Sequence, residues 1–432
     1  MGVNNKARRA AKRRKRDARS GSLRAGTSTY GGSAEAGHDY YAVAALVQRL
    51  VEACAADPGV AVSYATSLTD ADSGLPPGAV ADVVEHVVGT LLGVVTRSGW
   101  APADLGEITR RRLTTRHVPA LAAALATETG RHPSDRVSDA WREDLARLGQ
   151  ACPADLNTVD GLAQALGLAG LFSVLPVLAV LVPPPGVRSD GARRSRHAAD
   201  ARQLARVRAL LAKAESTEFE EEADALSAKA QELISRYALD RLMDDAAARP
   251  AQGQTALLAR RLWIDAPYVF PKALLIDAVA SANRCRSVVA EELGFATIVG
   301  EPRDLDAVEL LATSLLVQGN AAMLRHGRHG DRGGRTRTRP FRRSFLIAYA
   351  TRIGERLRAA TLVATEQAGR SGELVPVLER HEQRVAAATQ EMFPRLQERG
   401  TSISDGYGWA AGRAAADLAL LDADLQVTSA AG

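Results

Sequence analysis

The chain has 432 residues, long enough for two or three folded units, and 46% of them are hydrophobic, enough to form packed cores. The net charge is +5, but residues 1–37 alone carry +8, which leaves −3 for the remainder and argues against a surface that is basic throughout. The three cysteines have no metal-binding spacing, and no apolar stretch follows the basic N-terminus, so we expect a reduced, cytoplasmic protein without a secretory signal.

The first two segments differ sharply in composition. Residues 1–37 predict a disordered basic tail, because a cationic cluster precedes Gly- and Ser-rich sequence. Residues 38–182 predict an all-helical domain, because apolar residues recur at helical spacing between Pro, Gly and Asp. Its end, residues 162–182, carries no charge, and we favour a buried helix stopped by Pro176 over a membrane span, since no Trp or Tyr marks its ends.

A Pro- and Arg-containing linker at residues 183–199 leads into a predicted helical hairpin at residues 200–245. The second helix of the hairpin has a heptad-like apolar seam, and Thr217 and Glu220 have the spacing of a capping box. The many glutamates of the hairpin lie mainly off this seam, near a helix start where negative charge is favoured. We therefore interpret the acidic run as part of a scaffold and not as a catalytic carboxylate cluster.

The hairpin also carries a family resemblance. Its sequence RVRALLAKAESTEFEEEADALSAKAQELISRYALD resembles the domain-of-unknown-function family numbered 2786, which is found in bacterial and phage proteins. The resemblance implies a hairpin followed by an α+β region, with a helical N-terminal region in the longer members, and it extends over residues 38–425. It implies no activity and no cofactor, because the family has none established.

The remaining region, residues 255–425, predicts an α+β domain, so the fold class is mostly α with an α+β C-terminal domain. Its first elements follow the order β-α-β-β-α, and the last helix of that order has Asp304 as its expected N-cap. The predicted strands are 257–265, 285–292, 295–301 and a short one at 373–379, and the predicted helices are 271–283, 304–325, 341–369, 381–393 and 408–420.

The main candidate site is an arginine-rich loop at residues 325–343. Guanidinium groups match phosphate geometry, and the glycines between them would let the backbone follow a polyanion. Phe341 is the only aromatic residue nearby, which gives little support for base stacking. The tail is a second basic segment of this kind. The predicted nucleic-acid-binding residues are Arg325, Arg328, Arg332, Arg335, Arg337, Arg339, Arg342, Arg343, Arg13, Arg14, Lys15 and Arg16.

Other motifs favour structural interpretations. His326 and His329 form an H-x-x-H pattern, but they lie among arginines that would repel a metal cation. Cys285 lies between two arginines without a catalytic partner, and we interpret it as a structural residue at a strand start; His86 is interpreted as a helix-packing residue and Gly412 as a site of close helix packing. We expect no catalytic residue, no metal and no cofactor.

The leading hypothesis is a non-catalytic protein that contacts DNA or RNA without sequence specificity through its tail and its arginine-rich loop. One alternative is a metal-dependent hydrolase or nuclease with a site in residues 255–425, for which Asp265, Asp277 and Glu309 are unranked candidates. Another is a helical adaptor whose residues 38–182 bind a partner protein. Membrane association is not expected.

Overall fold

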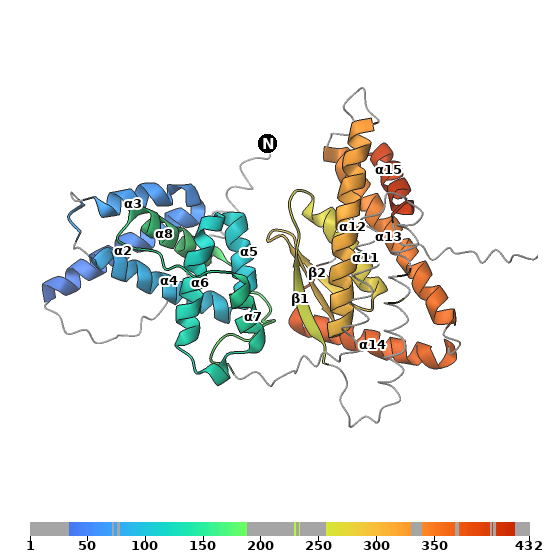
Figure 1. The fold of residues 1–432 in the computed structure, drawn as a ribbon, viewed down its shortest axis with the longest axis horizontal. Coiled ribbons are helices and arrows are strands. Elements are labelled where there is room, and N and C mark those ends of the chain that lie inside the picture. The colour runs from blue at the N-terminus through green and yellow to red at the C-terminus, as the bar shows by residue number, and fades with distance from the viewer. Residues whose placement is uncertain are drawn as a thin grey trace, which may run out of the picture.

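The computed structural model describes residues 34–70, 73–75, 78–187, 229, 233, 256–329, 339–367, 371–397, 400 and 403–419 (Figure 1). The predicted hairpin lies outside the described residues except for Lys229 and Leu233, as do most of the basic tail and of the linker. In the described part, two hydrophobic cores form, one from residues 43–172 and one from residues 233–419.

The first core is built from helices, as the apolar spacing predicts. The central helices α2, α4 and α8 pack against one another and bury Val, Leu and Ala side chains such as Val47, Leu92 and Leu166. Helix α2 begins at Ala34, within the stretch predicted to be disordered. The helices are α2 (Ala34–Ala56), α3 (Ala61–Thr69), α4 (Ala79–Arg97), α5 (Pro102–Arg112), α6 (Val118–Gly130), α7 (Asp139–Arg147) and α8 (Val159–Val174), with 3-10 turns at Pro58–Val60, Thr115–His117 and Ser134–Arg136.

The uncharged stretch 162–182 is only partly helical. Thr158 caps the start of α8 by accepting a hydrogen bond from the Gly161 N–H, and the helix ends at Val174, before Pro176. The following residues run extended past the end of α4, where Trp100 Nε1 donates to the Pro176 carbonyl at 2.8 Å. The proline stop is therefore confirmed, and the helix does not continue over residues 175–182.

Among the described residues, one helix, α4, is long and apolar enough to cross a membrane. Core helices of the same length and composition pass this test equally well. Helix α4 contributes Val83, Val84 and Leu92 to the first core.

The second core lies beneath a small antiparallel sheet, and the predicted β-α-β-β-α order is confirmed. The described strands are ordered β1-β3-β2, with β3 paired to both neighbours. The elements are β1 (Leu258–Trp263), α11 (Val269–Ala282), β2 (Arg286–Ala290), β3 (Phe295–Gly300), α12 (Pro302–His329), α13 (Arg339–Gln367), α14 (Ser371–Met392) and α15 (Gly406–Asp417).

Two local predictions in this region are wrong. Helix α12 begins at Pro302, a residue well suited to a first helical position, so Asp304 lies inside the first turn and is not the N-cap. The expected strand at residues 373–379 is part of helix α14, which accommodates Pro376 in its interior. Pro376 is the sixth residue of α14, beyond the four whose N–H groups have no intrahelical partner, so its ring removes one hydrogen bond of the helix.

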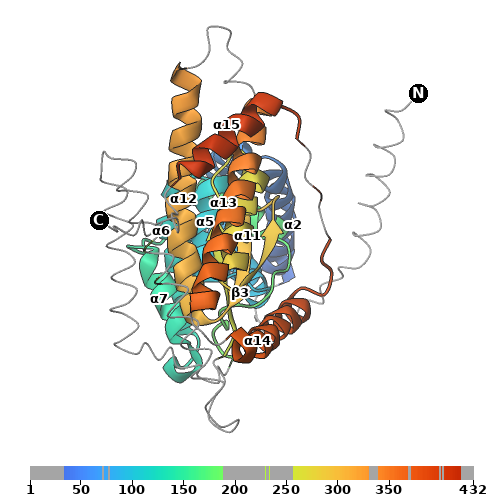
Figure 2. The ribbon, with the colours of Figure 1, turned by 90° about the vertical axis from the view of Figure 1, so that its right-hand side faces the viewer.

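The two faces of the sheet meet different partners. Because side chains alternate along a strand, Arg260 and Leu262 of β1 face helix α12 and the second core, while Arg261 and Trp263 face the first helical unit. Strand β3 is covered on both faces, and all six of its residues are buried. Figure 2 shows helices α11, α12 and α13 layered on one side of the sheet, with α15 crossing α13.

Helix α15 packs closely on α13 through its glycines, as predicted for Gly412. A Cβ atom at Gly408 would collide with the Phe341 backbone, and one at Gly412 with the Phe345 carbonyl. Glu355 of α13 accepts hydrogen bonds from Arg413 of α15 at 3.0 and 2.9 Å, and from Arg352. These hydrogen bonds lower the pKa of Glu355 to about 2, so the carboxylate stays charged across the physiological range.

The two halves of the chain are joined by a buried ion pair. The Arg261 side chain is 4% exposed and contacts the Asp104 carboxylate of α5, whose other oxygen accepts from Trp263 Nε1 at 3.3 Å. Arg261 also donates to the carbonyls of Gly99 at 3.1 Å and Ala179 at 2.6 Å. One guanidinium group thus ties β1 to three separate segments of the first unit.

Two neighbouring arginines extend this interface. Arg111 of α5 donates to the Ile264 carbonyl at 2.6 Å and to Asp265 at 2.8 Å, and its guanidinium lies 5.2 Å from the centre of the Trp263 ring. Arg112 donates to the Glu292 carbonyl at 2.8 Å. Through these arginines, helix α5 contacts one end of the sheet and the face that points away from the second core.

Replacing Asp104 with Ala should lower the free energy of unfolding by about 3–5 kcal/mol, because it leaves the Arg261 guanidinium buried without its counter-charge. Denaturant unfolding followed by tryptophan fluorescence measures the loss. The double variant Asp104→Ala with Arg261→Met should be less destabilised than the single variant.

The matched control is Asp139→Ala, since Asp139 pairs with Arg142 at the surface and its side chain is 89% exposed. We expect this control to cost less than about 1 kcal/mol. Equal losses for Asp104→Ala and Asp139→Ala would show that the buried pair does not hold the two halves together.

Candidate functional site

The predicted arginine-rich loop is helical at both ends. Helix α12 continues through His329, and α13 begins at Arg339, directly before Pro340. A glycine inside a helix costs only about 1 kcal/mol relative to alanine, so Gly327 does not end α12. The prediction of a continuous loop over 325–343 is therefore wrong, and the H-x-x-H histidines lie on a helix.

The predicted binding residues consequently fall into three groups. Arg325 and Arg328 belong to the last turns of α12, and Arg339, Arg342 and Arg343 belong to the first turns of α13. The others lie outside the described residues: Arg332, Arg335, Arg337, Arg13, Arg14, Lys15 and Arg16.

Arg343 lines a surface pocket of about 340 Å³ beside the start of α11. The half-buried aromatic residues Tyr268 and Phe270 line the same pocket, and Glu291 is the carboxylate on its wall. The aromatic residue expected from the sequence, Phe341, is fully buried and packs against Phe345 and Tyr407. The aromatic side chains that line the pocket with Arg343 thus come from the residue before α11 and from its first turn, more than 70 residues earlier in the chain.

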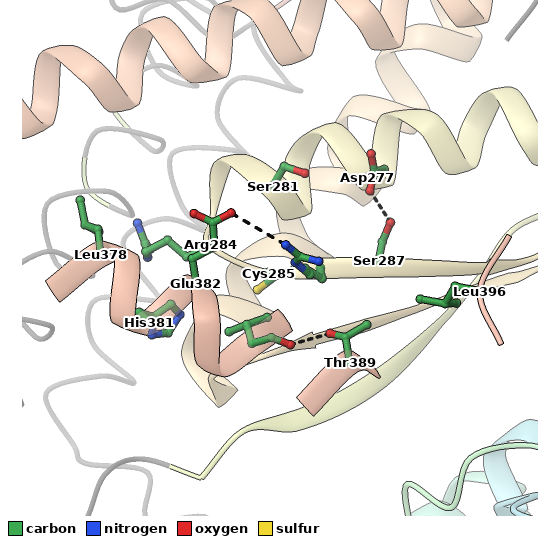
Figure 3. Close-up of a pocket in the computed structure, with 12 residues that line it drawn as sticks. Asp277, Ser281, Arg284, Cys285, Ser287, Leu378, His381, Glu382, Thr389 and Leu396 are labelled. Carbon is green, nitrogen blue, oxygen red and sulfur yellow. Dashed lines mark hydrogen bonds and ion pairs between the residues drawn. The ribbon is translucent and has the colours of Figure 1, made fainter. Parts of the chain in front are cut away.

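A second pocket, of about 480 Å³, lies at the opposite end of α11, where α14 passes the start of β2 (Figure 3). Its walls carry groups of both charges together with apolar side chains. The lining residues are Asp277 and Ser281 of α11, Arg284 and Cys285 of the connection, Arg286 and Ser287 of β2, Leu378, His381, Glu382, Val385 and Thr389 of α14, and Leu396 beyond it. We call this the α11–α14 pocket.

Buried charges lie beneath the α11–α14 pocket. Arg284 Nη2 lies 3.0 Å from Asp304 Oδ1, and both side chains are 10% exposed. His381 Nδ1 lies 3.6 Å from Glu301 Oε1, and Arg384 Nη1 approaches the same oxygen at 3.9 Å. A buried ionic cluster beside a cleft is the arrangement expected of a functional site, although ion-pair networks with a purely structural role share it.

Two of these buried groups retain unused hydrogen-bonding capacity. The Nε of Arg284 has no hydrogen-bond partner among the described residues, and the ring of His381 has none there besides a contact with the Arg284 backbone. Burial lowers the pKa of His381, and the positive charges of Arg284 and Arg384 lower it further, against the opposing effects of Asp304 and of a hydrogen bond with the Arg284 backbone. His381 is therefore a neutral imidazole at physiological pH, with one donor and one acceptor nitrogen.

The backbone at Arg284 is also unusual. Its φ is +60°, a left-handed conformation that favours glycine, in the position just after the end of α11. An arginine here presents its side chain to the pocket and to Asp304 at a conformational cost of roughly 1 kcal/mol. Strained residues of this kind cluster at functional sites.

The sequence alone did not identify His381, Arg284, Glu301 or Asp304 as a cluster. One signal was available: Leu378, His381 and Val385 have the 3- and 4-residue spacing of one helix face, which places the histidine on an apolar stripe. Interpreting residues 373–379 as a strand concealed that stripe. The proximity of Glu301 and Arg284 to it depends on how α14 packs against the sheet.

Comparison with known proteins identifies one part of the chain. Residues 202–241 match the family described as Protein of unknown function (DUF2786). The resemblance predicted for the hairpin is thereby confirmed, while its extension over residues 38–425 stays a prediction. No curated protein and no solved structure matches the chain.

Within the DUF2786 segment, the structure describes Lys229 and Leu233. Leu233, predicted to lie on the apolar seam of the hairpin, is 8% exposed and belongs to the second core. The DUF2786 segment therefore contacts the α+β unit through at least this side chain.

The carboxylates considered for a hydrolase contact different partners. Asp265 pairs with Arg111 at the interface, Glu309 pairs with Arg260, and Asp277 accepts a hydrogen bond from Ser287 at the rim of the α11–α14 pocket. In the part of the chain that the structure describes, no group of three or more His, Cys, Asp or Glu side chains could hold a metal ion.

Two other predictions can be compared with the structure. Cys285 is 3% exposed and directly precedes β2, as expected of a structural cysteine. Burial raises its pKa well above the ordinary value, outweighing the effect of Arg284, so the thiol is not activated. His86 is exposed on α4, so its interpretation as a helix-packing residue is wrong.

Replacing His381 with Asn should reduce the loss of stability on acidification. The folded state lowers the pKa of His381, so the unfolded chain binds more protons between that pKa and about 6.5, and stability falls as the pH drops below about 6.5. Urea unfolding at a series of pH values between about 7.5 and 5 measures this dependence.

His117 has a pKa lowered by burial as well, so the variant should retain part of the acid sensitivity. The exposed His86→Asn serves as the control and should keep the slope of the original protein. An unchanged slope in His381→Asn would contradict the prediction.

Proposed function

We propose that this protein binds single-stranded nucleic acid, without sequence specificity, at the arginine-bearing start of α13. The observation that carries the proposal is that Arg343 lines one pocket together with Tyr268 and Phe270. Phosphates would contact the guanidinium groups, and a base would stack against an aromatic ring, as in other single-strand binders.

Several further features support this proposal. Arg339 is exposed and Arg342 half-buried at the same helix start, where the helix dipole adds to the positive potential. The basic residues of the tail and those at 332, 335 and 337 would add sequence-independent contacts with phosphates.

We place this activity in the cytoplasm of a bacterial or phage-infected cell. All three cysteines are free, which supports a reducing compartment. Binding of a partner protein by residues 38–182 stays a separate hypothesis, to be tested by salt-insensitive copurification.

The triple variant Arg339→Gln, Arg342→Gln, Arg343→Gln should bind a fluorescent oligonucleotide more weakly than the unaltered chain. Because each phosphate contact with a single strand contributes about 0.7 to the slope of log Kobs against log salt, the slope should shrink by about 2. Fluorescence anisotropy with single-stranded DNA, single-stranded RNA and duplex DNA of equal length, after nuclease treatment of the protein, measures both quantities.

The control is the triple variant Arg131→Gln, Arg142→Gln, Arg147→Gln, which removes the same charge from exposed arginines of the first helical unit. This control should change the slope of log Kobs against log salt by less than half as much as the triple variant at the start of α13 does. Equal effects of the two triple variants, or no salt-dependent binding by the unaltered chain, would refute the proposal.

A further inference from the structure

The α11–α14 pocket has a lining that selects for a particular kind of small molecule. Arg284 and Arg286 contribute positive charge, and Asp277 and Glu382 contribute negative charge. A phosphate dianion would face both carboxylates, and a purely apolar ligand would leave the charged groups desolvated without partners. The balance of charges favours a ligand that is itself both anionic and cationic.

The buried groups indicate where the anionic end would lie. Arg284 Nε lacks a hydrogen-bond partner among the described residues and needs an acceptor. His381, 3% exposed and neutral, offers one donor nitrogen beside it. A carboxylate placed against these two residues would give the buried Arg284 Nε an acceptor and would accept a hydrogen bond from the His381 ring.

The rim and the remaining wall indicate the other two contacts. Asp277 and Glu382 are carboxylates at the rim, and Glu382 lies 3.9 Å from Arg286 in a loose, solvent-exposed pair that a ligand ammonium could join. Leu378, Val385 and Leu396 supply the apolar part of the lining. A volume of about 480 Å³ accommodates an amino acid with a medium-sized side chain.

We propose that the α11–α14 pocket binds a free amino acid with an apolar side chain. Its carboxylate contacts Arg284 and His381, its ammonium group contacts the carboxylates of Asp277 and Glu382, and its side chain packs on the apolar wall formed by α14 and Leu396. The left-handed backbone at Arg284 contributes to this site, because it directs the guanidinium from the end of α11 toward the pocket. The site is independent of the proposed nucleic-acid surface, which lies at the other end of α11.

The test is isothermal titration calorimetry of the full-length protein with L-leucine and two truncated analogues. 4-Methylpentanoic acid lacks the ammonium group, and 3-methylbutylamine lacks the carboxylate. We expect leucine to bind with a Kd tighter than about 1 mM and each analogue to bind about tenfold more weakly or worse, because each lacks one charge-assisted set of hydrogen bonds.

Variants at the exposed rim locate the site without endangering the fold. Glu382→Gln should weaken leucine binding about tenfold and leave the binding of 4-methylpentanoic acid unchanged or stronger. Glu379→Gln, on the exposed face of the same helix and outside the pocket lining, is the matched control and should leave both unchanged.

Three results would overturn the proposal: no leucine binding, leucine binding no tighter than both analogues, or equal effects of Glu382→Gln and Glu379→Gln.

Discussion

The buried ion pair between Arg261 and Asp104 is the interaction on which the arrangement of this protein depends. The Arg261 side chain is only 4% exposed. A charge buried in this way costs free energy unless a counter-charge and hydrogen-bond acceptors surround it. Here the neighbours are the Asp104 carboxylate and two carbonyls, from Gly99 and from Ala179. The Nε of Arg261 already lacks a partner in the described part of the chain, so removing any one of these segments would leave the guanidinium with fewer hydrogen bonds still.

This contact decides the environment of the sheet. Three antiparallel strands with helices on one face would leave the other face to solvent, and an alternating polar pattern would be expected there. Instead, the side chains of Phe295 and Trp263 pack edge to face at 5.0 Å, Arg261 lies over the Phe295 ring, and the whole of β3 is buried. The first helical unit therefore covers this face of the sheet, with polar contacts from α5 beside the packing of Trp263 and Leu293 on the first core.

With one face of the sheet covered by α5 and its neighbours and the other by α11 and α12, the two candidate sites lie at the ends of α11. The pocket at its start combines Tyr268 and Phe270, at the beginning of α11, with Arg343 of α13. The pocket at its end combines Arg284, the strand β2 and His381 of α14. One suits a polyanion with flat bases, and the other suits a small molecule with balanced charge. The chemistry of the two pockets differs because different helices close them, α13 at one end and α14 at the other.

The sequence by itself determined the helices of the first unit, the β-α-β-β-α order, the close approach at Gly412 and the DUF2786 segment. These follow from local spacing, from proline and glycine positions, and from the identity of a contiguous stretch. The strand predicted at residues 373–379 was wrong, because a short apolar run around Pro376 is compatible with a strand as well as with the first turns of a helix. Only the tertiary structure decided that Phe341 is buried while Tyr268 and Phe270 meet Arg343, that Arg261 joins two units, and that His381 lies beside Glu301 and Arg284. Each of these depends on which side chains meet across elements that are distant in the chain, and periodicity within one element carries no information about that.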